Sequence, residues 1–539
     1  WWDDLWLNES FAEWAAHHAS VKATRFTEAW TGFTNARKNW AYRQDQLPST
    51  HPIAADNYDL EAVEGNFDGI TYAKGASTLK QLVAWVGEEP FLAGLSAYFA
   101  EHAFANAEFG DLLSALTAAS GRELDSWATE WLTTSGVNTL AADFAVDDAG
   151  AFTRFAIRQT ALAEFPTLRR HRIRVGLYDA VDGRLVRRTS VETDISGEST
   201  DIAELVGQDQ PDLVLLNDGD LTYAKIRLDE RSLATLVASI ATLDDSLARA
   251  LCWGAAWDMT RDAELAATDF VTLVLSGIGS ETDITAVQAL LTYARSSADS
   301  YSAPDTRAAL RATWEEGVRE LLHAAEPGSD HQLAFLRSFA ASAHTTGGLD
   351  LVQGLYDGTE TVAGLEVNQD LRWSLLHALA AGGRADESAI EAELGRDNTI
   401  AGQEKAAGAR ASIPSSAAKQ WAWEAAVLGN DLPNETMRSV CASFQVAGQE
   451  DLLAPYVAQY LEVAETIIET KGVWIARVNL ELTFPRAIAT QETLDAVTAW
   501  LADTKASPAA VRYVKEGQAD LVRALAAQKK DQKKDQQKG

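Results

Sequence analysis

Cysteine is nearly absent from this sequence, because only Cys252 and Cys441 occur among its 539 residues. Two cysteines are too few for a disulfide framework, and their apolar helical surroundings predict small buried side chains rather than redox centres. The sequence also lacks any run of roughly eighteen apolar residues, which excludes a membrane-spanning helix within it. Its first residues contain no basic region followed by an apolar one, so no signal peptide is visible, although a start upstream of residue 1 would hide one. We therefore expect a cytoplasmic protein.

Basic residues are scarce: the chain has 46 Lys and Arg but 78 Asp and Glu, which gives a formal charge of -32. Binding to nucleic acid needs a basic face, so we expect no nucleic-acid partner. We also expect no membrane partner and a monomeric chain. An acidic proteome or a salt-adapted host accounts for such a charge without any function. The one basic segment, QKKDQKKDQQK at 528–538, has no apolar residue to bury and predicts a disordered tail over 528–539.

The patterns of three common enzyme classes are also missing. We find no Gly-x-Gly-x-x-Gly, no phosphate-binding loop of the Walker type and no Gly-x-Ser-x-Gly. Hydride transfer, phosphoryl transfer and serine-ester chemistry therefore have no support in this chain.

Apolar periodicity divides the chain into three parts. Over 1–140 the spacing is helical, with one apolar stripe at Leu7, Phe11, Trp14, Ala15 and His18. Over 141–230 the period changes to two, which predicts a small antiparallel β-sandwich. Over 231–527 successive amphipathic segments, such as 246–259 and 284–296, predict an α-solenoid of helix pairs. The expected fold is thus multidomain and mainly α.

The β part contains one clear turn signal. Asn217-Asp218-Gly219-Asp220 separates a compact apolar strand, 212–216, from the segment 221–228. Such a turn favours a hairpin, so we expect 221–228 to return beside the preceding strand.

Two motifs carry chemistry. Residues 1–14 read WWDDLWLNESFAEW, with Glu9 inside Asn8-Glu9-Ser10-Phe11-Ala12, and residues 67–76 read FDGITYAKGA, with Tyr72 at their centre. This pair, in this order, resembles the zinc aminopeptidases of the aminopeptidase N family. The order of a helical part, a β-sandwich and a helical array also resembles the last three parts of that family. The resemblance implies the helical part of a zinc peptidase catalytic domain over 1–140.

The resemblance implies that Glu9 is the third ligand of a catalytic zinc ion. The family places this glutamate about nineteen residues after the second histidine of His-Glu-x-x-His. None of the nine histidines begins such a motif, so we expect it to lie upstream and the chain to be a fragment that is inactive by itself. Without the resemblance, Glu9 and Glu13, one helical turn apart, are typical of a solvated surface pair.

The resemblance also gives Tyr72 a role. Hydrolysis of a peptide by zinc-activated water builds an oxyanion, and the family tyrosine donates a hydrogen bond to it. Tyr72 is therefore the candidate catalytic residue, whereas composition alone favours a core tyrosine. We expect Lys74-Gly75 and His51-Pro52-Ile53 to serve packing and a turn.

The function implied is a zinc metalloaminopeptidase that removes N-terminal residues from peptides. A different class stays open, namely a non-catalytic helical scaffold or interaction module with an aminopeptidase-like fold. A relative that hydrolyses epoxides at the same zinc site is a further alternative, against which the long C-terminal array argues.

Overall fold

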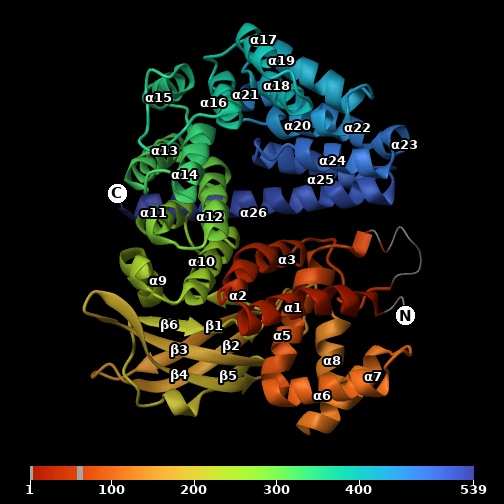
Figure 1. Ribbon diagram of the computed structural model, residues 1–539, viewed down its shortest axis with the longest axis vertical. Coiled ribbons are helices and arrows are strands. Elements are labelled where there is room, and N and C mark those ends of the chain that lie inside the picture. Colours follow the sequence, from red (N-terminus) through yellow and green to blue (C-terminus); the bar gives the residue numbers. More distant parts are fainter. Residues whose placement is uncertain (1–3, 57–62, 64, 539) are drawn as a thin grey trace. The chain divides into compact units, whose positions relative to one another are not determined.

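The computed structural model describes residues 4–56, 63 and 65–538, without the side chains of 535–538. Trp1, Trp2 and Asp3 of the first motif therefore lie outside the described residues. The chain forms two compact units: residues 1–259 with 280–289, and residues 260–279 with 290–539. The three-part division predicted at 140, 230 and 527 stays a prediction. The protein is mainly α with a small region of sheet, as the sequence indicates (Figure 1).

The first unit opens with a group of helices around the two motifs. These are α1 (Leu5–Ala23), α2 (Ala29–Gly32), the π-helix η1 (Phe33–Lys38), α3 (Asn39–Gln44), the π-helix η2 (Ile70–Lys74), α5 (Gly75–Val86), α6 (Glu88–Glu101), α7 (Phe109–Ser120) and α8 (Asp125–Leu132). The unit also holds α9 (Glu230–Ser239) and the short helices η3 (Ala203–Leu205) and η4 (Ile240–Thr242). Helices α10 (Ser246–Arg261) and α12 (Ile284–Ser296) are divided between the two units, and both match predicted helices.

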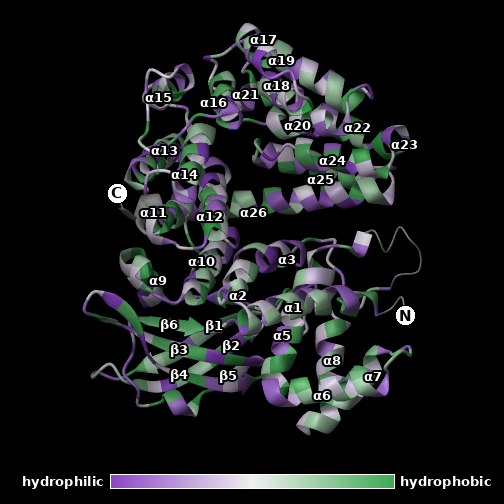
Figure 2. Cartoon of the chain, in the orientation of Figure 1, coloured by the Kyte–Doolittle hydropathy of each residue, from purple (hydrophilic) through white to green (hydrophobic). Residues whose placement is uncertain are grey.

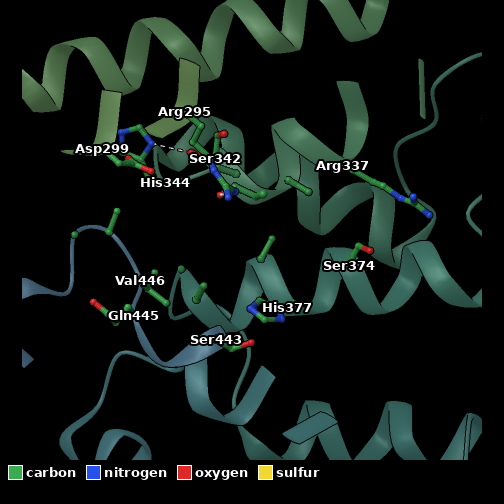
Figure 3. Close-up of a pocket in the computed structure, with 18 of the residues that line it drawn as sticks. Arg295, Asp299, Arg337, Ser342, His344, Ser374, His377, Ser443, Gln445 and Val446 are labelled. Carbon is green, nitrogen blue, oxygen red and sulfur yellow. Dashed lines mark hydrogen bonds between the residues drawn. The ribbon is translucent and has the colours of Figure 1, made fainter. Parts of the chain in front are cut away.

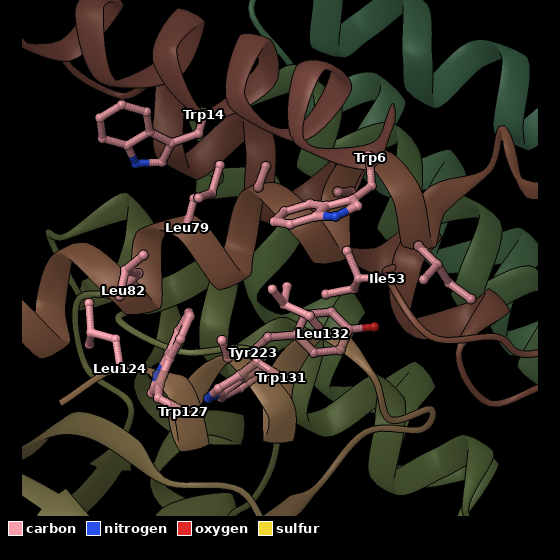
Figure 4. Close-up of a cluster of buried hydrophobic side chains, with 14 of the residues drawn as sticks. Trp6, Trp14, Ile53, Leu79, Leu82, Leu124, Trp127, Trp131, Leu132 and Tyr223 are labelled. Carbon is pink, nitrogen blue, oxygen red and sulfur yellow. The ribbon is translucent and has the colours of Figure 1, made fainter. Parts of the chain in front are cut away.

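The hydrophobic core of the helical part gathers tryptophans from α1 and α8. Trp6, Trp14, Trp127 and Trp131 are all buried, together with Tyr223 (Figure 4). The buried line of α1 runs through Trp6, Ser10 and Trp14. Trp14 of the predicted stripe is confirmed as a core residue, whereas Leu7, Phe11 and Ala15 only pack against the edge of this core. Ser10 lies at the centre of the buried face.

Within the described residues, seven strands form two sheets. The strands are β1 (Thr139–Val146), β2 (Phe152–Thr160), β3 (His171–Val181), β4 (Arg184–Ile195), β5 (Ser199–Asp201), β6 (Leu213–Leu216) and β7 (Lys225–Arg227). One sheet has the order β5-β2-β1-β7 and the other β4-β3-β6. Pairing is antiparallel except between β1 and β7, which run parallel. That pair departs from the antiparallel arrangement expected, and the packing of the two sheets as a sandwich stays a prediction.

The predicted hairpin at 217–220 is wrong, because β6 and β7 belong to different sheets. The turn between them is buried and polar. Asp218 accepts a hydrogen bond from the hydroxyl of Tyr178 at 3.1 Å, and Asp220 lies in a buried ion pair with Lys38. These side-chain bonds to other elements hold the turn and direct the chain from one sheet to the other. The local sequence of a turn does not predict such contacts.

The second unit is helical throughout the part that the structure describes. Its elements are α11 (Ala267–Gly277), η6 (Ser297–Tyr301), α13 (Arg307–Ala324), α14 (Asp330–Ser342), α15 (Thr346–Asp357), α16 (Gln369–Ala381), α17 (Glu387–Arg396), α18 (Ile400–Ser412), α19 (Ser416–Ala422), η7 (Trp423–Leu428), α20 (Asn434–Phe444), α21 (Glu450–Leu453), α22 (Tyr456–Ala464), α23 (Ile467–Lys471), α24 (Val473–Thr483), α25 (Gln491–Asp503) and α26 (Pro508–Lys538). The solenoid arrangement stays a prediction.

Capping side chains begin many of these helices. Ser329, Thr345, Asn368 and Thr399 each accept a hydrogen bond from the backbone N–H three residues on. Polar and apolar residues alternate along the helices, as Figure 2 shows, and the apolar positions supply the buried faces. Within the described residues, no helix combines the length and the apolar character needed to cross a membrane.

The disordered tail predicted over 528–539 is wrong for residues 528–534, where α26 continues. Gln528 donates a hydrogen bond to the carbonyl of Ser300 at 2.9 Å. Asp531 is buried and accepts from the backbone N–H groups of Thr268 and Ala303, both at 3.0 Å. The segment is ordered by polar contacts instead of apolar burial, which explains why its composition was misleading.

Candidate active site

Glu9 and Tyr72 meet in the first unit, although they come from separate motifs. Glu9 lies half-buried on α1, and Tyr72 lies half-buried in the π-helix η2. The Tyr72 hydroxyl lies close enough to the Glu9 carboxylate for the two groups to interact. Burial, hydrogen bonding with Glu9 and the charge of Glu9 raise the pKa of Tyr72 to about 12, against a smaller opposing effect of Arg37. The phenol is therefore protonated at neutral pH and is available as a donor.

This pair makes a direct prediction for the phenol. Replacing Glu9 with alanine is expected to lower the pKa of Tyr72 from about 12 toward the ordinary value of about 10, because the acceptor and its negative charge are both removed. Tyrosinate absorbance after rapid pH jumps, taken as the difference from a matched Tyr72→Phe protein, reports this group alone. An unchanged pKa in the Glu9→Ala protein would show that burial alone holds it high.

The start of η2 is fixed by Asp68. Its Oδ1 accepts hydrogen bonds from the backbone N–H of Ile70 at 2.8 Å and of Thr71 at 3.3 Å. Its Oδ2 lies 3.1 Å from Nε2 of His51, whose other ring nitrogen lies 2.8 Å from the carbonyl oxygen of Pro52. His51 thus anchors a turn, as expected from the sequence. π-Helical segments recur at functional sites, which makes the position of Tyr72 in one of them notable.

Ser10 ties the two motifs together. Its hydroxyl donates to the carbonyl of Thr71 at 2.6 Å, in the buried interior. Ser10 follows Glu9 and Thr71 precedes Tyr72, so this bond links the backbones that carry both candidate residues. The contact needs a glycine opposite, because a Cβ on Gly75 would lie 1.8 Å from the Ser10 hydroxyl oxygen.

Substitution of Gly75 with alanine is therefore expected to destabilise the protein by about 1–3 kcal/mol through overpacking. Alanine in place of glycine inside an ordinary helix stabilises by up to ~1 kcal/mol, so the sign of the change is diagnostic. In a Ser10→Gly background the clash disappears, and Gly75→Ala is expected to be neutral or stabilising. Chemical denaturation of the four proteins measures this cycle, and equal destabilisation in both backgrounds would contradict the contact.

Lys74 holds the end of η2 from within the core. Its Nζ lies 2.8 Å from Oδ2 of Asp45, and both side chains are fully buried. Asp45 also accepts from the hydroxyl of Thr50 at 2.7 Å and from the N–H of Gly136 at 3.0 Å. Burial lowers the pKa of Lys74 to about 8, and Asp45 opposes that shift. Lys74 and Gly75 thus act in packing, as the sequence indicates.

A second charged pair lies beside Tyr72. Arg37 of η1 binds Glu13 through two bonds, with Nε 2.5 Å from Oε1 and Nη2 3.2 Å from Oε2. Its guanidinium lies 4.7 Å from the ring centre of Trp40 and 6.0 Å from that of Tyr72. The sequence left two interpretations of Glu13, a surface residue or a residue that supports the site from behind its ligands; its side chain is only 9% exposed, which argues against the surface. Arg37 was missed, because no short-range pattern connects η1 with α1.

Glu9 is the candidate ligand for a zinc ion among the described residues. A catalytic zinc ion takes three protein ligands and keeps one position open. Among the residues that the structure describes, no three His, Cys, Asp or Glu side chains gather closely enough to hold a metal ion. Glu9 suits one ligand by its chemistry, since its Oε1 accepts a hydrogen bond from the side-chain amide of Asn8 at 3.1 Å and a carboxylate has further lone pairs on both oxygens. The described residues alone do not complete a zinc site.

Comparison with known proteins adds to this geometry. The model of the peptidase family M1 domain matches residues 1–131, which contain both motifs, and the model of the ERAP1-like C-terminal domain matches residues 213–523, more than half of the chain. The chain belongs to the aminopeptidase N family. The family assignment rests on both ends of the chain, and it agrees with the resemblance carried by the two motifs.

Relatives with curated names include an aminopeptidase N from Streptomyces lividans, 49% identical over 98% of this chain and 63% of that protein. The tricorn protease-interacting factor F2 of Thermoplasma volcanium is 38% identical over 26% of this chain and 18% of its own length. The alanine/arginine aminopeptidase of Saccharomyces cerevisiae is 35% identical over 26% of this chain and 16% of its own length. The chain thus spans less than two thirds of each of these relatives of the aminopeptidase N family.

Proposed function

We propose that this chain contributes to a zinc metalloaminopeptidase that removes N-terminal residues from peptides. In this proposal Glu9 is a metal ligand and Tyr72 is the oxyanion donor. The observation that carries it is the proximity of the Tyr72 hydroxyl to the Glu9 carboxylate, supported by the hydrogen bond from Ser10 to the carbonyl of Thr71. These contacts join two motifs that are far apart in the sequence and lie in the region matched by the peptidase model.

The chemistry assigned to these residues follows from their environment. A zinc ion, when bound, supplies a Lewis acid and an activated water molecule. Glu9 would help to hold that ion through one carboxylate oxygen. Tyr72, kept protonated by its raised pKa, would donate its hydroxyl proton in a hydrogen bond to the substrate carbonyl oxygen as negative charge develops there. The hydrogen bond from Ser10 to the carbonyl of Thr71 would keep the side chains of Glu9 and Tyr72 in a fixed position relative to each other.

We propose further that two histidine ligands and the general base come from a His-Glu-x-x-His segment outside the sequence given. The chain alone is then expected to bind zinc weakly and to hydrolyse no peptide. We also propose a monomer that acts in the cytoplasm on peptides with a free N-terminus. The formal charge of -32 disfavours a nucleic-acid partner.

The test uses a chimera that joins, ahead of residue 1, the part of the Streptomyces lividans aminopeptidase N that this chain does not match. Hydrolysis of an aminoacyl-anilide by the chimera, and none by the chain alone, is the expected result. A folded chimera without turnover, under conditions where the Streptomyces enzyme is active, would favour the alternative of a non-catalytic scaffold.

A further inference from the structure

The second unit contains a cavity that is separate from the Glu9–Tyr72 pair. Its volume is about 810 Å³, and its lining comes from α12, η6, α13, α14, α16, α18 and α20 with the segments that follow α14 and α20. Sites for small ligands in proteins measure roughly 300–1,000 Å³. Arg295, Ser342 and His344 lie on one side of the cavity, and His377 and Ser443 lie on the other (Figure 3).

The cavity is positively charged in a strongly acidic protein. Four basic side chains, Arg295, Arg311, Arg337 and Lys405, line it with only two acidic ones, Asp299 and Asp370. Asp370 binds both Arg337 and Lys405, and Asp299 lies 3.1 Å from Arg311. His344, which also lines the cavity, pairs with the buried carboxylate of Glu315 at 2.9 Å. After these pairings an excess of positive charge remains, whereas the whole chain carries -32.

Arg295 is the basic side chain of this lining that has no carboxylate within ion-pair distance among the described residues, although its charge acts on Asp299 from farther away. Its Nη1 lies 3.5 Å from the carbonyl oxygen of Ala341, at the outer limit of a hydrogen bond. A guanidinium group carries five N–H donors in a planar fork. Most of these donors are therefore available to a ligand that enters the cavity.

His377 supplies a polar group across the cavity from Arg295 (Figure 3). Burial, with a further effect of Lys419, lowers the pKa of His377 to about 4. The ring is therefore neutral at physiological pH, and in the described part of the chain no side chain or carbonyl is bonded to its nitrogens. A neutral imidazole donates one hydrogen bond and accepts another without adding charge.

We propose that this cavity binds a small oxyanion, a carboxylate or a phosphate, with Arg295 as the principal donor and His377 as a neutral hydrogen-bonding partner. A guanidinium fork matches the two oxygens of either group and binds them through paired, charge-assisted hydrogen bonds. The excess of positive charge attracts such a ligand, and the cavity volume fits a small molecule.

Isothermal titration of the full chain with inorganic phosphate and with citrate tests this site. We expect saturable binding of one stoichiometric equivalent of at least one probe. Arg295→Met keeps the aliphatic stem but removes the donors, and is expected to weaken binding by about tenfold or more. Arg438→Met is the matched control, because Arg438 is an exposed arginine of the same unit outside this lining, and its binding is expected to be unchanged.

The two probes distinguish the source of the ligand. Tighter binding of phosphate identifies a phosphate ester, and tighter binding of citrate identifies an organic acid. If Arg295→Met does not fold, as judged by circular dichroism, His377→Phe serves as a second variant, since its apolar ring removes the opposite hydrogen-bonding partner and is expected to weaken binding measurably, although less than the loss of Arg295. Failure of both probes to bind, or wild-type affinity in the folded variants, would overturn the assignment. Neither result depends on the metal site, because no metal is added.

Discussion

Replacing Tyr72 with phenylalanine in the chimera is expected to lower kcat by about 10²–10³, with little change in KM. The phenol bonds to the transition state more strongly than to the ground state in the proposed mechanism, so its loss acts on the chemical step. The raised pKa of about 12 keeps the hydroxyl proton in place across the neutral range. Steady-state hydrolysis of an aminoacyl-anilide measures both constants.

Tyr98→Phe is the matched control for this experiment. Tyr98 is a half-buried tyrosine of α6 whose pKa is also raised, mainly by burial. Its loss is expected to leave kcat within about twofold, since surface-type changes usually cost little. A Tyr72→Phe enzyme with undiminished kcat would remove Tyr72 from the mechanism and leave it as a packing residue.

Replacing Asp45 with alanine is expected to destabilise the protein by about 3–5 kcal/mol, because Lys74 is then left buried without its partner. Thr50 and the N–H of Gly136 lose an acceptor as well. The burial that lowers the pKa of Lys74 to about 8 also sets the pH dependence. The unfolded chain binds this proton up to a higher pH than the folded one, so this group makes stability rise with pH between about 8 and 10.5.

The Asp45→Ala deficit should accordingly shrink as pH rises, because neutral Lys74 no longer needs a counter-charge. Urea unfolding of the parent and Asp45→Ala proteins at several pH values measures both the loss in free energy of unfolding and its dependence on pH. Asp244→Ala provides the comparison, since Asp244 pairs with Arg184 where both side chains are more than half exposed, and such pairs contribute only about 0–1 kcal/mol. If Asp45→Ala lowers the free energy of unfolding as little as Asp244→Ala does, the buried pair of Asp45 and Lys74 does not hold η2.

Much of the secondary structure could be predicted from local patterns. The helix over 284–296 has the expected bounds, and the strands β2, β3 and β4 cover the segments with a period of two. These patterns depend on burial along one face, which each segment records in its own sequence. The two motifs likewise indicated both Glu9 and Tyr72 as candidate site residues, and their roles remain proposals.

What the sequence could not predict depends on contacts between distant segments. The turn at Asn217–Asp220 looks like a hairpin until Lys38 and Tyr178 are placed against its carboxylates. The tail at 528–534 looks disordered until Thr268 and Ala303 supply donors for Asp531. The pattern of apolar residues does not predict buried polar side chains of this kind, because the partner of each one lies far away along the chain.

The same limit applies within the candidate site. Arg37 reaches Glu13 and the ring of Tyr72 from another helix, and nothing in its local sequence marks it. Ser10 lies inside the first motif, and its structural role becomes clear only when the carbonyl of Thr71 and Gly75, which has no side chain, lie opposite its hydroxyl.

The role of Glu9 as a metal ligand is tested most directly by the zinc content of the purified chimera. We expect about one zinc ion per chain in the parent chimera, the number that a single catalytic site holds, and far less in the Glu9→Ala protein. Glu13→Ala is the control, because Glu13 lies one turn away on α1 and binds Arg37 instead, so its zinc content should be unchanged. A folded Glu9→Ala chimera that keeps its full zinc content would contradict the assignment.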